Sequence, residues 1–282
     1  MKKLILSATL AASLVLSSTA AYAATYPIVI DGVTIVSEAQ PEMKNDRLMV
    51  PLRVISENLG AEVEWTAAQV VLTKQDMKVT LSLMDGKANK NGVALTVDAK
   101  PYVSKDRLLV PIRLIAEAFG ASVSYKDGQV SVQAQPLKIG GVPVASLQQE
   151  YRMIMGGVVS EISGEAYQEQ LYALLSRDLG EKVEAPEHYD WRALIDDPGS
   201  YSQFGAYTFR DKDGKELADY DLCALVEAFP DELLAGLPKY LVHDAVSDEW
   251  FVLDNARPDA IAEVLERARN NGFIKEISNT VA

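Results

Sequence analysis

The first half of this chain contains a long internal repeat. Residues 46–65 align without gaps on residues 106–125, and eleven of these twenty positions are identical. The stretch Arg47-Leu-Met-Val-Pro-Leu-Arg53 of the first copy returns as Arg107-Leu-Leu-Val-Pro-Ile-Arg113 in the second. Two copies of one unit fold alike and pack against each other, which is typical of a scaffold rather than of a catalytic centre.

The first 23 residues have the features of a secretory signal peptide. Lys2 and Lys3 supply the positive charge, residues 4–16 are apolar or small, and Ala21-Tyr-Ala23 fits a small-x-small cleavage pattern. We therefore predict cleavage near Ala23 and a secreted or wall-associated protein. The alternative is an uncleaved membrane anchor, for which the apolar stretch is shorter than the ~20 residues that cross a bilayer. No later stretch is apolar enough to span a membrane, so no transmembrane segment is expected in the mature chain.

The charge of the mature chain limits its partners. Removing Lys2 and Lys3 from the 27 basic residues leaves 25 against 40 acidic ones, a formal charge of −15. Such a charge repels nucleic acid and anionic lipid, so we expect neither as a partner. It is compatible with a cell-wall matrix that contains divalent cations. The partners that remain are a cell-wall polymer or another surface protein.

Each copy of the repeat is predicted to be rich in strands and to contain one short helix. Asp31-Gly32 and Asn91-Gly92 tolerate the positive φ of a two-residue turn, which predicts a β-hairpin at the start of each copy. Leu52, Ile55 and Leu59 fall on one face of a helix, as do their counterparts in the second copy. Further strands are expected over 47–50, 62–65, 70–74, 78–83, 107–110, 122–125 and 129–133.

Ten residues of the repeat are predicted to have structural roles. Proline suits the first turn of a helix, where its missing N–H would be unpaired anyway. Glycine ends a helix in the left-handed conformation, and the arginine and glutamate of the helix lie four residues apart. These residues are Arg47, Pro51, Arg53, Glu57 and Gly60 in the first copy, and Arg107, Pro111, Arg113, Glu117 and Gly120 in the second.

The four arginines of the repeat allow two interpretations. They could form a site for an anionic polymer, such as wall phosphates or carboxylates. They could instead pair with Asp46, Glu57, Asp106 and Glu117 and cover apolar surface with their aliphatic stems. The second interpretation is favoured, because each arginine has an acid at a pairing distance in the sequence.

The doubled motif resembles a known family. Asp-Arg-Leu-(Leu/Met)-Val-Pro-(Leu/Ile)-Arg-x-Ile-(Ala/Ser)-Glu-x-(Leu/Phe)-Gly-Ala is similar to the copper amine oxidase-like N-terminal domain, or stalk domain, over about residues 27–134. The resemblance implies an accessory module of extracytoplasmic proteins of Gram-positive bacteria, which positions other domains at the cell envelope. Copper amine oxidases carry catalysis in a separate domain, with three histidine ligands and a quinone formed from the tyrosine of an Asn-Tyr motif. This chain has two histidines and no Asn-Tyr, so we expect no oxidase activity, no cofactor and no metal.

The rest of the chain, residues 137–282, is predicted to be a separate α+β domain that follows a boundary near 138–143. Helices are expected over 146–159, where Gly156-Gly157 weakens the pattern, and over 164–179, 221–229 and 258–271. Strands are expected over 204–209, 240–246, 250–253 and 273–277, and a loop with a short helix near Trp191 over 181–202. The predicted fold class is thus α+β. A β-rich domain of residues 25–135, made of two pseudo-symmetric units, precedes this second domain.

Two features of the second half are candidates for a calcium site and for a reactive thiol. Asp211-Lys-Asp-Gly214 could begin a calcium loop, but Phe209 and Tyr220 occupy positions where ligands are needed, so a hairpin turn is favoured. Cys223 is the only cysteine and lies in an apolar run. We expect a buried, inert thiol, with an intermolecular disulfide as the alternative.

Catalytic patterns are sparse in the second half. His188 and His243 lack a second metal ligand at helix or turn spacing, and no Gly-x-Ser-x-Gly motif is present. Glutamate pairs such as Glu161 with Glu165, or Glu181 with Glu184, could serve a wall glycosidase, but 40 acids produce such pairs by chance. No catalytic residue is therefore predicted.

The sequence favours a non-enzymatic protein of the cell envelope. In this hypothesis the stalk-like domain positions the C-terminal domain at the bacterial surface, where that domain binds a partner. Two alternatives stay open: a cell-wall-active hydrolase in the C-terminal domain, and a structural surface protein that self-associates.

Overall fold

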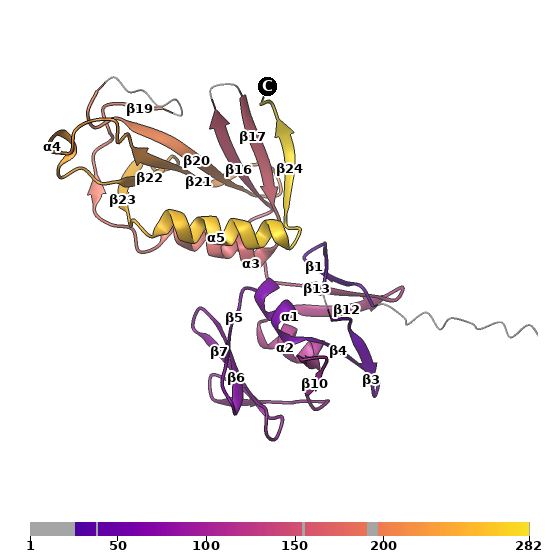
Figure 1. Cartoon of the computed structure of the whole chain (residues 1–282). Coiled ribbons are helices and arrows are strands. Elements are labelled where there is room, and N and C mark those ends of the chain that lie inside the picture. The colour runs from indigo at the N-terminus through magenta and orange to yellow at the C-terminus, as the bar shows by residue number, and fades with distance from the viewer. Residues whose placement is uncertain (1–25, 38, 154–155, 191–196, 282) are drawn as a thin grey trace, which may run out of the picture.

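The computed structural model describes residues 26–37, 39–153, 156–190 and 197–281. The predicted signal peptide and Trp191 lie outside these residues. The chain has two parts stacked end to end, with helices α3 (Glu165–Ser176) and α5 (Arg257–Asn270) between them (Figure 1). We call residues 26–134 the N-terminal part and residues 146–281 the C-terminal part. The α+β class predicted from the sequence is confirmed.

Three sheets make up the N-terminal part. The first has the order β12 (Ser122–Lys126), β13 (Gln129–Gln133), β1 (Ile28–Ile30) and β2 (Val33–Ile35). The second has the order β10 (Tyr102–Ser104), β11 (Arg107–Pro111), β4 (Arg47–Pro51) and β3 (Glu42–Lys44). The third runs from β5 (Glu62–Trp65) through β6 (Gln69–Lys74), β7 (Met77–Ser82) and β8 (Ala88–Lys90) to β9 (Val93–Leu95).

Strands of one copy of the repeat pair with strands of the other copy. Strand β13 of the second copy pairs in parallel with β1 of the first, and β7 of the first copy pairs with β8 of the second. The two outer sheets differ, because β7 lies between β6 and the β8–β9 hairpin while β13 contacts β1 directly. Both predicted hairpins are confirmed, with positive φ at Asp31, Gly32, Asn91 and Gly92.

The two short helices of the N-terminal part follow the central strands. Helix α1 (Leu52–Asn58) comes directly after Pro51, and α2 (Ile112–Ala118) directly after Pro111. Their apolar residues face inward as predicted, since Leu52, Ile55 and Leu59 are at most 1% exposed. Each helix covers the central sheet and thereby closes the core of this part.

The described residues of the C-terminal part form a nine-stranded sheet. A small hairpin, β14 (Lys138–Ile139) with β15 (Val142–Pro143), precedes it. Eight strands follow the order β18 (Lys182–Val183), β23 (Glu249–Leu253), β22 (Tyr240–Asp244), β21 (Glu216–Leu225), β20 (Tyr201–Arg210), β16 (Ser146–Met153), β17 (Gly156–Ile162) and β24 (Ile274–Asn279). Strand β19 (Tyr189–Asp190) pairs in parallel with β20, and α4 (Asp231–Leu234) is a single exposed turn.

Two predicted helices are strands instead. Residues 146–159 form β16 and the start of β17, and residues 221–225 are the end of β21. In β21, Ala218, Tyr220 and Leu222 face the main core, while Cys223 belongs to a small apolar cluster on the other face. Both faces near residue 222 are therefore buried, which hides the period of two that marks a strand. The short helix expected near Trp191 lies outside the described residues. The helices over 164–179 and 258–271 are confirmed as α3 and α5.

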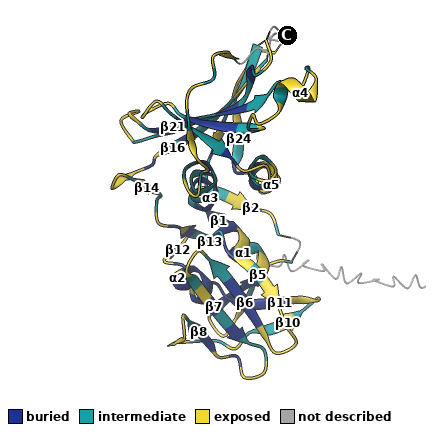
Figure 2. Cartoon of the chain, turned by 90° about the vertical axis from the view of Figure 1, so that its left-hand side faces the viewer, coloured by how far each residue is buried: buried dark blue, intermediate teal, exposed yellow. Residues whose placement is uncertain are grey.

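Helices α3 and α5 cover one face of the nine-stranded sheet and separate it from the N-terminal part (Figure 1). On the sheet side, the ring of Tyr172 lies 5.5 Å from that of Phe209. The larger cluster of buried residues runs through both parts, whereas α4 is largely exposed (Figure 2). None of the helices in the described residues is long and apolar enough to cross a membrane.

Hydrogen bonds tie α3 to the N-terminal part. The Tyr167 hydroxyl lies 3.2 Å from Asn58 Oδ1 of α1 and 2.9 Å from Asn271 Nδ2, just after α5. Lys74 Nζ lies 2.9 Å from Glu169 Oε2. Asp31 Oδ2 accepts the N–H of Glu165 at 3.1 Å, at the first residue of α3. Helix α3 is therefore held by residues from the beginning, the helix and the end of the first copy of the repeat.

Candidate functional site

The repeat glycines end their helices as predicted. Gly60 and Gly120 have φ of +84° and +78°, and the next residue in each case donates its N–H back to the carbonyl of residue 56 or 116. Gly60 has a second role, because a Cβ there would lie 3.1 Å from Ala166 Cβ of α3, whereas at Gly120 the nearest atom is 3.9 Å away. The end of the first repeat helix thus packs against α3, whereas the end of the second does not.

Arg53 and Arg47 contact carboxylates, and the pair that Arg47 forms differs from the prediction. Arg53 pairs with Glu57 at 3.6 Å, as expected from the four-residue spacing. Arg47 pairs with Asp98 rather than with the Asp46 side chain, and contacts only the backbone carbonyl of Asp46. The prediction for Arg47 was wrong because Asp98 is distant in the sequence and is brought close only by the fold.

The other two arginines have different surroundings. Arg107 donates to the backbone carbonyl of Asp106 at 3.4 Å. The Arg113 guanidinium carbon lies 5.3 Å from the centre of the Tyr125 ring, which is a cation–π distance. In the described part of the chain Arg113 has no ion pair, and Glu117, the predicted partner, does not provide one. The prediction for Arg113 was therefore wrong, since the ring of Tyr125 takes the place of the carboxylate.

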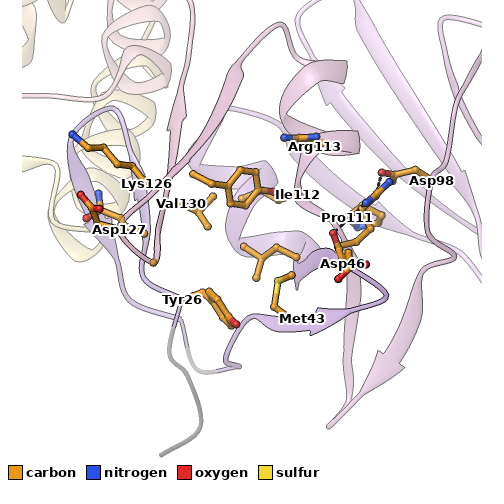
Figure 3. A pocket seen from close by; sticks show the side chains of 15 residues that line it. Tyr26, Met43, Asp46, Asp98, Pro111, Ile112, Arg113, Lys126, Asp127 and Val130 are labelled. Atoms are coloured by element: carbon orange, nitrogen blue, oxygen red, sulfur yellow. Dashed lines mark hydrogen bonds and ion pairs between the residues drawn. The ribbon is translucent and has the colours of Figure 1, made fainter.

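A groove of about 440 Å³ lies beside Arg113, and we call it groove A (Figure 3). Its lining combines residues 46–48 from the start of β4, residues 111–113 from the start of α2, and Tyr125 from β12. In Figure 3, Arg113 lies at its upper side and Asp98 at its right side, and Tyr26 and Met43 lie at its base. The groove is mostly apolar with charged groups at its edge, which is the usual composition of a ligand site.

A second groove, of about 520 Å³, has the same components from the other copy of the repeat, and we call it groove B. Its lining includes residues 106–108, residues 51–53 and Trp65, each sixty positions from a counterpart in groove A. The pairing of β4 with β11 explains this, since Pro51 lies opposite Leu109 and Pro111 opposite Met49. The turn before each strand therefore lies beside the helix start of the other copy.

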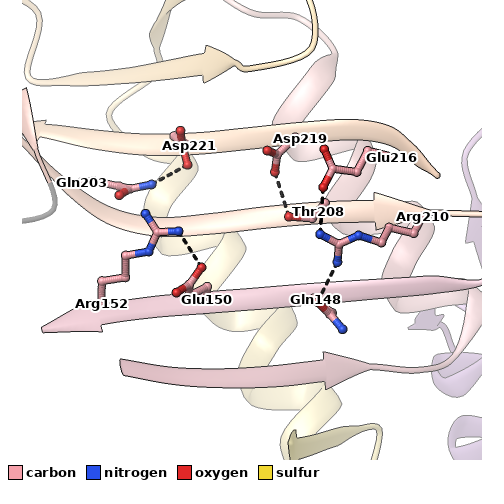
Figure 4. Close-up of polar contacts among 9 residues, drawn as sticks. All are labelled: Gln148, Glu150, Arg152, Gln203, Thr208, Arg210, Glu216, Asp219 and Asp221. Atoms are coloured by element: carbon pink, nitrogen blue, oxygen red, sulfur yellow. Dashed lines mark hydrogen bonds and ion pairs between the residues drawn. The ribbon is translucent and has the colours of Figure 1, made fainter. Parts of the chain in front are cut away.

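The face of the nine-stranded sheet opposite α3 and α5 carries a polar network (Figure 4). Arg152 donates to Glu150 at 2.8 Å, and Thr208 donates to Asp219 at 2.8 Å. Arg210 donates to Gln148 at 2.7 Å and to Glu216 at 2.9 Å. Gln203 donates to Asp221. These side chains come from β16, β20 and β21, and we call this surface the open sheet face.

Charge and burial on the open sheet face shift two carboxyl groups in opposite directions. The hydrogen bond from Arg152 holds the pKa of Glu150 below its ordinary value. Burial raises the pKa of Asp219, against the hydrogen bond from Thr208, and the charge of Asp221 adds to the increase. The face thus has an ion pair in which Glu150 stays ionised, and a carboxyl group, that of Asp219, that binds a proton more readily than usual.

Next to this network, His243 is held between two carboxylates. Its Nε2 lies 3.0 Å from Asp248 Oδ1, and its Nδ1 lies 3.5 Å from Asp221 Oδ2. Its ring stacks on Trp250 with centres 4.4 Å apart. Because the carboxylates face opposite ring nitrogens, they do not converge on a position that one metal ion could occupy.

Two other candidates from the sequence have contacts of their own. His188 Nε2 lies 3.5 Å from Asp197 and its side chain is 47% exposed. Glu165, one of the paired glutamates, accepts the N–H of Leu137 at 3.1 Å. The described residues contain no group of three or more His, Cys, Asp and Glu side chains that could hold a metal ion.

The hairpin turn predicted at Asp211 and the buried thiol predicted at Cys223 are both confirmed. Asp211 Oδ1 accepts the N–H groups of Asp213 and Lys215, both at 2.9 Å, in the turn between β20 and β21. This carboxylate closes a hairpin turn. Cys223 is fully buried, and burial raises the pKa of its thiol to about 12.

The open sheet face was missed in the sequence because residues 146–159 and 221–229 were predicted as helices, although residues 204–209 were predicted as a strand. The available signal was the alternation of polar residues, which are Gln148, Glu150 and Arg152 in β16 and Asp219 and Asp221 in β21. Grooves A and B could not be predicted, since each needs the β4–β11 pairing.

Comparison with known proteins gives one family. Residues 29–134 match the copper amine oxidase N-terminal domain family, which confirms the resemblance seen in the repeat. No curated protein and no solved structure matches the chain. The family therefore describes the N-terminal part, and the C-terminal part has no match.

Proposed function

We propose that this chain is a secreted, non-enzymatic protein of the bacterial cell envelope. In this proposal the N-terminal part positions the C-terminal part at the surface of a Gram-positive cell, and the open sheet face binds a protein or a wall polymer. The observation that carries the proposal is the open sheet face itself, a polar surface on the side of the sheet opposite α3 and α5 (Figure 4).

The arrangement of the two parts supports this role. Helices α3 and α5 cover one face of the sheet. They connect it to the N-terminal part through groups such as Tyr167 and Glu169. The opposite face presents Arg152, with a side chain that is 46% exposed, beside Glu150 at 36%. A partner can therefore reach these charged groups without disturbing the junction between the parts.

We further propose that the N-terminal part is a scaffold of two pseudo-symmetric units and that residues 25–135 and 137–282 are two domains. The repeat supports the first point, together with the pairing of Val50 with Val110 at equivalent positions. The separate sheets of the two segments support the second. A match to the N-terminal domain of copper amine oxidases is consistent with an accessory role, and residues 1–23 with secretion.

Binding to purified cell walls tests the proposal. The mature protein, wild type and Arg152→Gln, is sedimented with purified walls, and bound partners are identified after crosslinking on intact cells. We expect Arg152→Gln to reduce binding severalfold, because it removes a charge from the open sheet face. Arg269→Gln on the exposed face of α5 makes the same charge change and should bind as wild type. The proposal fails if the wild-type protein neither sediments with walls nor crosslinks to a surface protein, or if both variants behave alike.

A second candidate is self-association through a sheet edge. Strand β24 is bonded on one side to β17, and five of its six residues are exposed. Such an edge can pair with a second copy of the chain. Light scattering after size-exclusion chromatography would give twice the monomer mass in that case, and the monomer mass would remove this candidate.

A further inference from the structure

Grooves A and B have the same side-chain chemistry. In each, an aromatic ring lies beside a guanidinium group: Tyr125 with Arg113 in groove A, and Trp65 with Arg53 in groove B, at 5.3 and 6.0 Å. Both aromatic residues are exposed, Tyr125 at 47% and Trp65 at 42%. An exposed ring above an apolar groove offers a flat surface on which the C–H face of a sugar can pack.

An available cation lies next to each ring. Arg113 has no carboxylate partner within the described residues, so its charge is not neutralised by the protein. Arg53 has Glu57 at 3.6 Å, but their side chains are 59% and 47% exposed, so this is a weak surface pair. An acidic group of a ligand can therefore be bound by either guanidinium in a two-pronged manner.

The overall charge of groove A limits the kind of ligand. Arg47, Arg113 and Lys126 line it together with Asp46, Asp98 and Asp127. The formal charges cancel, so a dense polyanion would be repelled by the carboxylates as much as it is attracted by the cations. Hydroxyl groups suit this mixture better, because they donate to carboxylates and accept from guanidinium groups.

We propose that grooves A and B are two equivalent binding sites for a pyranose polymer that carries acidic substituents. A sugar ring packs on Tyr125 or Trp65, its hydroxyls bind the aspartate of the neighbouring turn, Asp46 or Asp106, and an acidic substituent pairs with Arg113 or Arg53. One polymer chain that occupies both grooves gains affinity through the high effective concentration of the second site. This inference goes beyond the proposed function, because the N-terminal part binds here whether or not the open sheet face has a partner.

The test measures binding of three soluble probes to the mature full-length protein by calorimetry. The probes are oligogalacturonate, an uncharged chito-oligosaccharide, and inorganic polyphosphate, which has charge but no sugar rings. We expect oligogalacturonate to bind more tightly than the uncharged glycan, and polyphosphate to bind least. Binding in groove B should also change the fluorescence of Trp65.

Arginine variants show whether the grooves are responsible. Arg113→Gln and Arg53→Gln should each weaken oligogalacturonate binding roughly tenfold, the effect of losing one charge-assisted contact, and the double variant by more than either alone. Arg269→Gln, on α5 and far from both grooves in the sequence, should bind as wild type. Urea midpoints of the variants should equal that of the wild type, since both arginines are exposed.

Three results would overturn this inference. One is that the wild-type protein binds neither glycan. Another is that polyphosphate binds as tightly as oligogalacturonate, which would indicate a non-selective anion surface. The third is that Arg113→Gln and Arg53→Gln bind as wild type. Each of these leaves the wall-binding test of the open sheet face unaffected, because that test depends on Arg152.

Discussion

Val50 and Val110 lie directly opposite each other in the antiparallel pair β4–β11. Both side chains are fully buried, and they occupy the same position in the two copies of the repeat. The central strand of each copy is thus paired with the central strand of the other copy. Neither copy can bury its own strand without its partner.

This relationship predicts that Val50→Ala and Val110→Ala have similar effects. Each should lower the free energy of unfolding by roughly 2 kcal/mol, because each leaves a small cavity in the same place. The double variant should differ from the sum of the single ones by about 0.5 kcal/mol or more, as expected for residues in contact. Urea denaturation measures all three. Val103→Ala, at a position that is 69% exposed, is the control and should change little; strict additivity would contradict the contact.

Tyr167→Phe should weaken the junction between the two parts. The hydroxyl of Tyr167 contacts Asn58, which is 2% exposed, and Asn271. Removing it takes the hydrogen-bond partner from Asn58 Oδ1 and from Asn271 Nδ2, while Asn58 Nδ2 still donates to the Val54 carbonyl. This loss should cost about 1–3 kcal/mol. Tyr151→Phe, at a side chain that is 46% exposed, serves as the control. Equal unfolding midpoints for the two variants would show that the hydroxyl contributes nothing.

Asp31→Ala should be much more destabilising than Asp127→Ala. Both residues have positive φ, 47° and 52°, in Asp-Gly turns, so both variants carry the same backbone strain. Only Asp31 also accepts the N–H groups of Ala134 and Glu165, at 2.8 and 3.1 Å. We expect a difference of about 2–4 kcal/mol between the variants, from two buried donors left unpaired. Thermal unfolding measures it, and equal losses would exclude a role for these hydrogen bonds.

Gly164→Ala tests the approach of α3 to the last strand. Gly164 has φ +83°, and a Cβ there would lie 2.5 Å from Phe273, which is 1% exposed. Gly214→Ala has almost the same φ of +80° with nothing within 4 Å, so it reports backbone strain alone. We expect about 1–2 kcal/mol for Gly214→Ala and an additional 1–3 kcal/mol for Gly164→Ala from overpacking. Chemical denaturation of both variants checks this difference.

The Cys223 thiol should be unreactive in the folded protein. Burial raises its pKa from 9.0 to about 12, so the nucleophilic thiolate is absent at neutral pH. The stabilisation linked to this group is fully present below pH 9 and is lost as the pH rises toward 12. A thiol reagent at pH 8 should label the protein only in guanidinium chloride. Rapid labelling of the folded protein, or a disulfide-linked dimer on non-reducing gels, would contradict this prediction.

The elements with strong local signals were predictable. Three kinds of element form as expected: the Asp-Gly hairpin and the Asn-Gly hairpin, the short helices between proline and glycine at residues 51–60 and 111–120, and helices α3 and α5. Strand β21 was not predicted because tertiary packing buries residues on both of its faces, Leu222 on one and Cys223 on the other. Strand β16 was not predicted because only Leu147 is buried in it, so its apolar residues do not alternate. The partners of Arg47 and Arg113 were also wrong, since sequence spacing suggests only local pairs.

The sequence alone determined the repeat, the family of residues 29–134 and the conformations that proline and glycine impose on the chain. These properties depend on neighbouring residues, so they can be read locally. The tertiary structure decided which groups meet: Val50 with Val110, Tyr167 with Asn58, and the turn of one copy with the helix start of the other. The grooves and the open sheet face exist only through such distant contacts, because each combines residues from strands that are separated in the chain and paired in the fold.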